Sequence, residues 1–123
     1  YEDTDLAGIV YYANYLKFIE RARTEWVEVL GIDQARLKAE DGIVFAVRRV
    51  EADYLKPALF GDVLEVTCDP VRVTGARIEV DQTVSRVDEV LFKARVTQVC
   101  QTERGAQARI PATIRTAMDR RSA

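Results

Sequence analysis

The sequence of 123 residues contains no histidine and only two cysteines, Cys68 and Cys100. Without histidine, the chain cannot use Ser-His-Asp or Cys-His catalysis, or a zinc site with imidazole ligands. The two cysteines show no metal-ligand spacing, and we interpret them as reduced core thiols of a cytoplasmic protein. We therefore expect no metal and no cofactor, so that any chemistry falls to carboxylates and backbone dipoles.

The sequence also lacks a long apolar run and an excess of charge of one sign. No apolar segment approaches the roughly 20 residues that a membrane-spanning helix requires, so we expect no membrane span. The net charge of −2 provides no basic footprint for nucleic acid. With 48% hydrophobic and 31% charged residues, the composition is that of a single folded domain, which we assign to residues 1–123. Because the sequence begins at Tyr1 and not at Met, we expect further residues upstream.

Apolar residues recur at helical spacing after Asn14, which we interpret as a helix N-cap. The stripe predicts one long helix that begins at Tyr15 and stops at Gly31. One charged residue, Arg23, falls inside the apolar stripe, and a buried guanidinium needs a carboxylate. We expect an internal pair with Glu20, one turn earlier, and keep a direct role of Arg23 in a functional site as the alternative.

A second, short helix is predicted from Asp33 to Glu40, before Gly42, and the apolar period then changes to two. The alternation predicts four strands, at 43–52, 62–73, 77–84 and 90–97, with a bulge at Asp69-Pro70. Short turns between them predict an antiparallel sheet whose apolar face only the long helix can cover. The predicted fold class is therefore α+β, a curved antiparallel sheet wrapped around one long central helix. Its open edges predict a homodimer, and residues 115–123 are predicted to form a loose polar tail.

Three segments of the sequence are similar to one known family. The similarity lies in Y-x-D-T-D-x-x-G-I-V-Y-Y-x-N-Y (Tyr1 to Tyr15) and F-I-E-R-A-R-T-E-W (Phe18 to Trp26), which closely resemble the hotdog-fold acyl-CoA thioesterases. The subgroup is that of 4-hydroxybenzoyl-CoA thioesterase and the YbgC-like proteins. A third segment, D-Y-L-K-P-A-L-F-G-D (Asp53 to Asp62), resembles that family's link between its second and third strands. The resemblance implies a homodimer, with a dimer of dimers left open, whose sites lie at the dimer interface and receive coenzyme A thioesters.

The resemblance also implies roles for individual residues near the start of the sequence. Asp5, the second aspartate of D-T-D, is the implied catalytic carboxylate, and the backbone amide of Tyr12 is the implied donor that polarises the thioester carbonyl. The expected substrate-binding residues are Gly8, Val10, Tyr11 and Tyr15. Glu20 is the alternative carboxylate, because other hotdog thioesterases place theirs on the central helix. YbgC-like members usually carry a histidine where Tyr12 stands, so the substrate choice and any acid–base help from that histidine stay open.

The chemistry that these residues imply requires no metal. A carboxylate either attacks the thioester carbonyl directly, giving a mixed anhydride, or activates a water molecule. Both routes build negative charge on the carbonyl oxygen, and the N–H groups at a helix N-terminus stabilise that charge. The sequence thus predicts an acyl-CoA thioesterase that hydrolyses small acyl- or aroyl-CoA thioesters.

Two questions stay open in the sequence. The alternative function is that of a non-catalytic acyl-CoA-binding protein or an envelope-associated interaction protein, because YbgC-like members are linked to the Tol-Pal machinery. The basic residues that could meet the coenzyme phosphates are Lys56, Arg72, Arg77 and Arg86, and the sequence does not choose among them.

Overall fold

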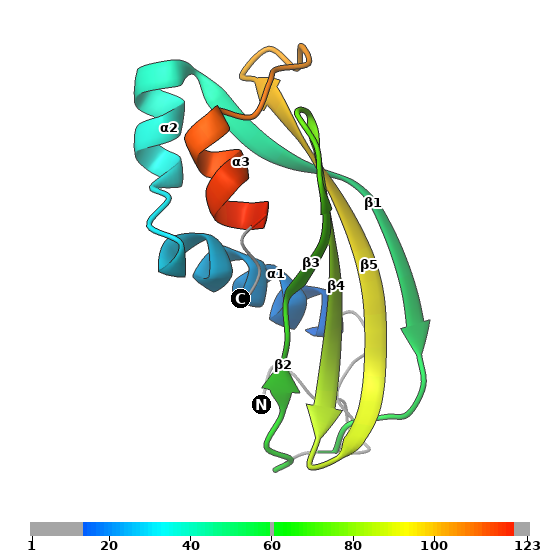
Figure 1. Cartoon of the computed structure of the whole chain (residues 1–123). Helices are drawn as coiled ribbons and strands as arrows, with labels where there is room; N and C mark the ends of the chain where they lie inside the picture. Colours follow the sequence, from blue (N-terminus) through cyan, green and yellow to red (C-terminus); the bar gives the residue numbers. More distant parts are fainter. Residues whose placement is uncertain (1–13, 60, 120–123) are drawn as a thin grey trace.

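The computed structural model describes residues 14–59 and 61–119 of the chain. Its elements follow one another as α1 (Asn14–Val29), α2 (Gln34–Asp41), β1 (Ile43–Tyr54), β2 (Glu65–Val66), β3 (Asp69–Val73), β4 (Arg77–Arg86), β5 (Glu89–Thr102) and α3 (Ala112–Asp119). In Figure 1 the strands form one curved sheet, and all three helices lie on its concave side. The predicted α+β class, with a curved antiparallel sheet around one long helix, is confirmed.

The sheet is antiparallel, with its strands in the order β1-β5-β4-β2, and β3 also pairs with β4. The predicted bulge is confirmed, because the register of β3 against β4 shifts between Pro70 and Arg72. Proline has no N–H to donate to the ladder, which is why it sits at such a break. The last strand, β5, runs to Thr102, beyond its predicted end, because β1 pairs with this part of the strand.

The end of α1 is set by its local sequence, as predicted. Gly31 adopts the left-handed conformation at φ 81°, which favours glycine. Its N–H donates to the carbonyl of Glu28 at 2.9 Å, and the N–H of Ile32 donates to the carbonyl of Val27 at 3.2 Å. These two bonds form a Schellman motif, which satisfies carbonyl groups that the helix leaves free. The predicted cap of α2 is also confirmed, since the Asp33 carboxylate accepts a backbone N–H of that helix.

The polar centre of the core differs from the prediction. Arg23 is only 8% exposed, and its Nη1 donates to Oε1 of Gln82 at 2.9 Å. Gln82, on β4, is fully buried and donates through Nε2 to the carbonyl of Ile19 at 2.8 Å. The predicted Glu20–Arg23 pair is wrong, because no carboxylate within residues 14–59 and 61–119 forms an ion pair with Arg23. Glu20 lies on the exposed side of α1, whereas Gln82 holds a buried position on β4 and reaches α1.

The C-terminal segment also differs from the prediction. Residues 112–119 form the helix α3, and Met118 is 1% exposed, so the loose tail predicted from residue 115 is wrong as far as residue 119. Ile110, Ile114 and Met118 recur every fourth position. Ile110 and Met118 are buried in the hydrophobic core, and Ile114 packs against it. This spacing gives the segment one apolar face, which a generally polar composition conceals. Figure 1 shows α3 beside β3, on the same side of the sheet as α1.

Candidate active site

The structure describes only some of the predicted site residues, because the others come before residue 14 in the sequence. Five of them lie outside the described residues, so their roles stay predictions: Asp5, Gly8, Val10, Tyr11 and Tyr12. Tyr15 and Glu20 are described, and both lie on α1. The part of the site that the structure shows is therefore the start of α1 and the elements packed around it.

The start of α1 is the positive end of the helix dipole. The helix begins at Asn14, which is 4% exposed, and its first turn contains no acidic side chain. A helix N-terminus carries about half a positive charge on backbone N–H groups that lack an intrahelical partner. Because no carboxylate of the first turn neutralises this charge, the helix end is suited to stabilising a developing oxyanion. The Tyr12 amide, predicted to donate to the thioester carbonyl, stands two residues before Asn14 in the sequence.

Tyr15 is buried at the start of α1. Its ring is 2% exposed and stacks on Phe92, with the ring centroids 5.0 Å apart. Its hydroxyl accepts the backbone N–H of Ala58 at 2.8 Å and donates to the carbonyl of Lys56 at 3.3 Å. Burial raises the pKa of the Tyr15 phenol, although the hydrogen bond from Ala58 opposes this shift. Tyr15 therefore connects α1 to the segment after β1, and its predicted substrate contact stays a prediction.

The segment between β1 and β2 is also fastened by charged groups. Asp62 accepts the backbone N–H of Leu59 at 2.7 Å and binds Arg86 at 2.8 Å. Arg86 also binds Glu89 at 2.7 Å, and Glu89 in turn pairs with Lys56. Hydrogen bonds from Lys56 and then Arg86 lower the pKa of Glu89 to about 2. The N–H of Leu59, followed by Arg86, lowers the pKa of Asp62. These carboxylates are thus ionised and tie the segment to the β4–β5 hairpin.

The ion pairs of the structure distinguish among the four basic residues that could meet the coenzyme phosphates. Lys56 and Arg86 each have carboxylate partners. No ion pair is found for Arg72 or Arg77 among the described residues, and both line a cavity of about 320 Å³ together with Arg48. Of the four basic residues, Arg72 and Arg77 are therefore the two without a carboxylate partner in the described part of the chain.

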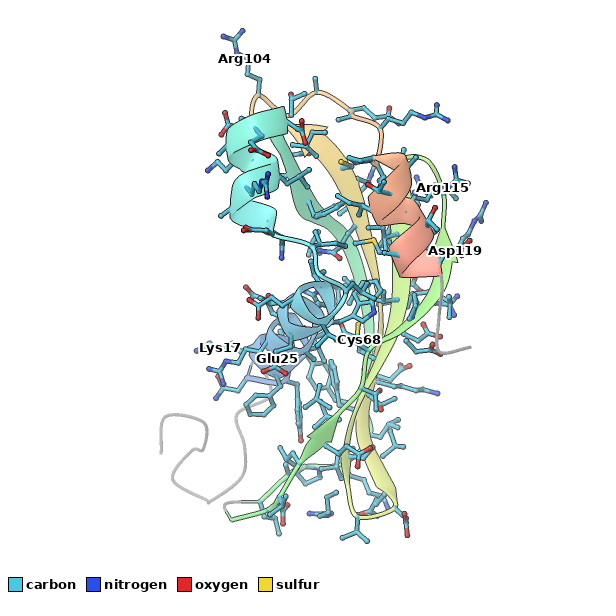
Figure 2. The ribbon with its side chains drawn as sticks, turned by 60° about the vertical axis from the view of Figure 1, so that its left-hand side comes forward. Lys17, Glu25, Cys68, Arg104, Arg115 and Asp119 are labelled. Atoms are coloured by element: carbon cyan, nitrogen blue, oxygen red, sulfur yellow. The ribbon has the colours of Figure 1, made fainter. Side chains whose placement is uncertain are left out.

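Glu20 lies on the exposed side of α1 and lines a cavity of about 340 Å³ with Arg23 and Gln98. Its role as the alternative carboxylate stays a prediction. Figure 2 shows Lys17 and Glu25 projecting from α1 away from the sheet, whereas Cys68 lies where α1 meets the sheet.

The two thiols are poor nucleophiles. Burial raises the pKa of Cys68 to about 11 and also raises the pKa of Cys100. Only the thiolate attacks a carbonyl, so neither cysteine is activated for catalysis. Within the described part of the chain, no group of three His, Cys, Asp or Glu side chains is arranged to hold a metal ion. None of the described helices has the length and apolar character needed to cross a membrane.

Two features of this region were missed by reasoning from the sequence. Gln82 did give a signal, because it stands between Val80 and Val84 at a position whose neighbours in the alternation are all apolar. The contact between Tyr15 and Ala58 gave none, since the two residues are 43 positions apart and alanine contributes only its backbone.

The arrangement defines a class of protein: one curved antiparallel sheet around a long helix is a hotdog fold. The same fold is found in a 1,4-dihydroxy-2-naphthoyl-CoA thioesterase from Synechocystis, with a TM-score of 0.87 and 23% identity over 97% of this chain and 89% of that one. Residues 7–93 match the Thioesterase superfamily, and the chain belongs to this family.

Two relatives show the similarity in sequence. The chain is 41% identical over 100 residues to the acyl-CoA thioesterase YbgC of Haemophilus influenzae, an alignment that covers 81% of this chain and 74% of the relative. It is 34% identical over 84 residues to a 1,4-dihydroxy-2-naphthoyl-CoA hydrolase of Thermosynechococcus vestitus, covering 68% of this chain and 58% of that protein.

Proposed function

We propose that this chain is an acyl-CoA thioesterase that hydrolyses small acyl- or aroyl-CoA thioesters to a free acid and coenzyme A. The observation that carries the proposal is the 41% identity to an acyl-CoA thioesterase over 81% of the chain. Similarity to a hydrolase of an aromatic CoA thioester supports the inclusion of aroyl substrates. The two free thiols fit a reducing compartment such as the cytoplasm.

In the proposed reaction, Asp5 supplies the carboxylate and the start of α1 supplies the oxyanion stabilisation. The carboxylate attacks the thioester carbonyl or activates the water that does so. The charge that builds on the carbonyl oxygen is met by backbone N–H groups, including that of Tyr12. The electropositive first turn of α1 supports this division of roles.

A panel of thioesters tests the proposed function. Purified protein is mixed with short-chain, medium-chain and aromatic acyl-CoAs, and the released thiol is measured with DTNB. We expect turnover of at least one small acyl- or aroyl-CoA, at a rate proportional to enzyme concentration. Binding of coenzyme A without thiol release from any member of the panel would favour the non-catalytic alternative.

We also infer that two copies pair through the edge strand β1. This strand is 12 residues long and pairs on one side only among the described strands. It leaves Val47 46%, Val50 40% and Tyr54 46% exposed. A long open edge with apolar side chains is a template for a second copy.

Light scattering on a sizing column tests this pairing. We expect a mass of about twice the 13.9 kDa of the chain. Val50→Glu is expected to shift the protein to the monomer, because it places a charge on the edge strand. Val63→Glu, at an exposed position outside the strands, serves as the control and keeps the dimer. A monomeric wild type, or a Val50→Glu variant that dimerises like the control, would rule out pairing through β1.

A further inference from the structure

Tyr15 joins two segments that are distant in the sequence but adjacent at the start of the central helix. It is the second residue of α1, and Ala58 lies within the segment that connects β1 to β2. The N–H of Ala58 donates to the Tyr15 hydroxyl at 2.8 Å, and that hydroxyl donates to the carbonyl of Lys56 at 3.3 Å. One side-chain oxygen thus bonds to two backbone groups of the same short segment.

The ring of Tyr15 is held as firmly as its hydroxyl. It stacks on Phe92 of β5 at a centroid distance of 5.0 Å and an interplanar angle of 15°. Phe18 contacts it edge-on at 6.2 Å, and Tyr54 lies at 6.0 Å. With 2% of the residue exposed, the ring cannot shift without displacing these neighbours. The position of the first turn of α1 is therefore coupled to the sheet through the ring.

The segment that receives the hydroxyl is itself anchored. The N–H groups of Leu55 and Lys56 donate to the carbonyl of Leu91 on β5 at 2.8 and 3.0 Å. Ala58 is fully buried, so its N–H depends on the Tyr15 oxygen for a hydrogen bond. Farther along, Asp62 binds Arg86 on β4. The Tyr15 hydroxyl consequently bonds to backbone that is already fixed on the sheet.

We propose that Tyr15 is a positioning residue for thioester hydrolysis, acting through α1 and not by contact with the substrate. This inference rests on the proposed function, in which the N–H groups at the start of α1 stabilise the oxyanion. Such donors act only when they lie within about 2.7–3.1 Å of the developing charge. Holding the first turn of α1 against the segment 55–58 keeps these N–H donors directed at the carbonyl oxygen of the thioester. This positioning role is an alternative to the substrate contact that the resemblance implies for Tyr15.

Tyr15→Phe tests the inference because it removes the hydroxyl and keeps the stacked ring. We expect kcat to fall between about 10- and 100-fold, the loss associated with a misplacement of about 1 Å. KM is expected to stay within about twofold, since Tyr15 does not touch the substrate. Hydrogen exchange is expected to show faster exchange of the Ala58 amide, because its hydrogen-bond acceptor has been removed.

Leu37→Ala is the matched control for a loss of stability alone. Leu37 is the buried residue of α2, and Figure 1 shows α2 away from the start of α1. We expect this variant to lower Tm and to keep kcat. A Tyr15→Phe variant that also loses Tm but keeps kcat would overturn the inference, and so would equal losses of kcat in the two variants.

A second change removes the hydrogen bond between Ala58 and Tyr15 by altering the donor, Ala58, instead of the acceptor. Replacing Ala58 with lactic acid exchanges its N–H for an ester oxygen and keeps the side chain, so it serves if Tyr15→Phe does not fold. The same fall in kcat is expected, and an unchanged kcat would overturn the inference. A wild type without thioesterase activity would overturn the proposed function and this inference together, whereas an active wild type with a fully active variant overturns the inference alone.

Discussion

Asp5→Asn is expected to lower kcat for the best acyl-CoA substrate by at least about 10²–10⁴-fold, the range associated with the loss of a general base. The amide that replaces the carboxylate is nearly the same size, but it neither attacks the thioester carbonyl nor takes a proton from water. A role as nucleophile would make the loss larger, because no other group would then form the covalent intermediate. Thiol release measured with DTNB over a range of substrate concentrations gives kcat and KM separately.

The matched control for this change is Asp3→Asn, which alters the same acidic stretch by the same substitution. We expect it to keep activity within about an order of magnitude, because the resemblance implies the catalytic role for the second aspartate of D-T-D, Asp5, and not for Asp3. Near-wild-type turnover of Asp5→Asn would contradict the assignment of the catalytic carboxylate. A large loss in Glu20→Gln alongside it would transfer that role to Glu20.

Gln82→Leu is expected to lower the free energy of unfolding by about 3 kcal/mol, because it removes the side-chain acceptor to which the buried Arg23 donates. It also removes the bond from Gln82 to the carbonyl of Ile19. Urea unfolding followed by circular dichroism measures the change, with the midpoint and the slope determined separately.

The double variant Arg23→Met/Gln82→Leu tests whether the two side chains act as a pair. It removes the cation together with its partner, and we expect it to recover most of the stability that Gln82→Leu loses. The single and double variants form a cycle that isolates the coupling between the two side chains. If the double variant is as unstable as the sum of the two single variants, Arg23 and Gln82 do not act as a pair.

The elements that were predicted correctly depend on a few adjacent residues. Gly31 ends α1 because only glycine adopts the required left-handed conformation easily. The alternation of Ile78, Val80, Gln82 and Val84 placed one face of β4 in the core, and all four are fully buried. Such patterns are local, so the first two helices and the curved antiparallel sheet around a long helix could be inferred before the structure.

The features that were not predicted depend on contacts between distant parts of the chain. Arg23 lies one turn from Glu20, yet it bonds to Gln82, which is 59 positions away. α3 forms because Met118 and the apolar residues before it pack in the core, and a packing surface is invisible in composition. The candidate site shows the same contrast between local and distant features. The D-T-D stretch was recognised from adjacent residues by resemblance, whereas the bond between Tyr15 and Ala58 could be found only in the structure.

Hydrolysis of an acyl-CoA thioester by this chain is best tested by quantifying both products together. Purified protein is incubated with excess thioester, and the free acid and coenzyme A are measured over time by liquid chromatography. We expect equimolar free acid and coenzyme A, each exceeding the enzyme concentration many times over. Recovery of the intact thioester, bound to the protein at one molecule per chain, would contradict it.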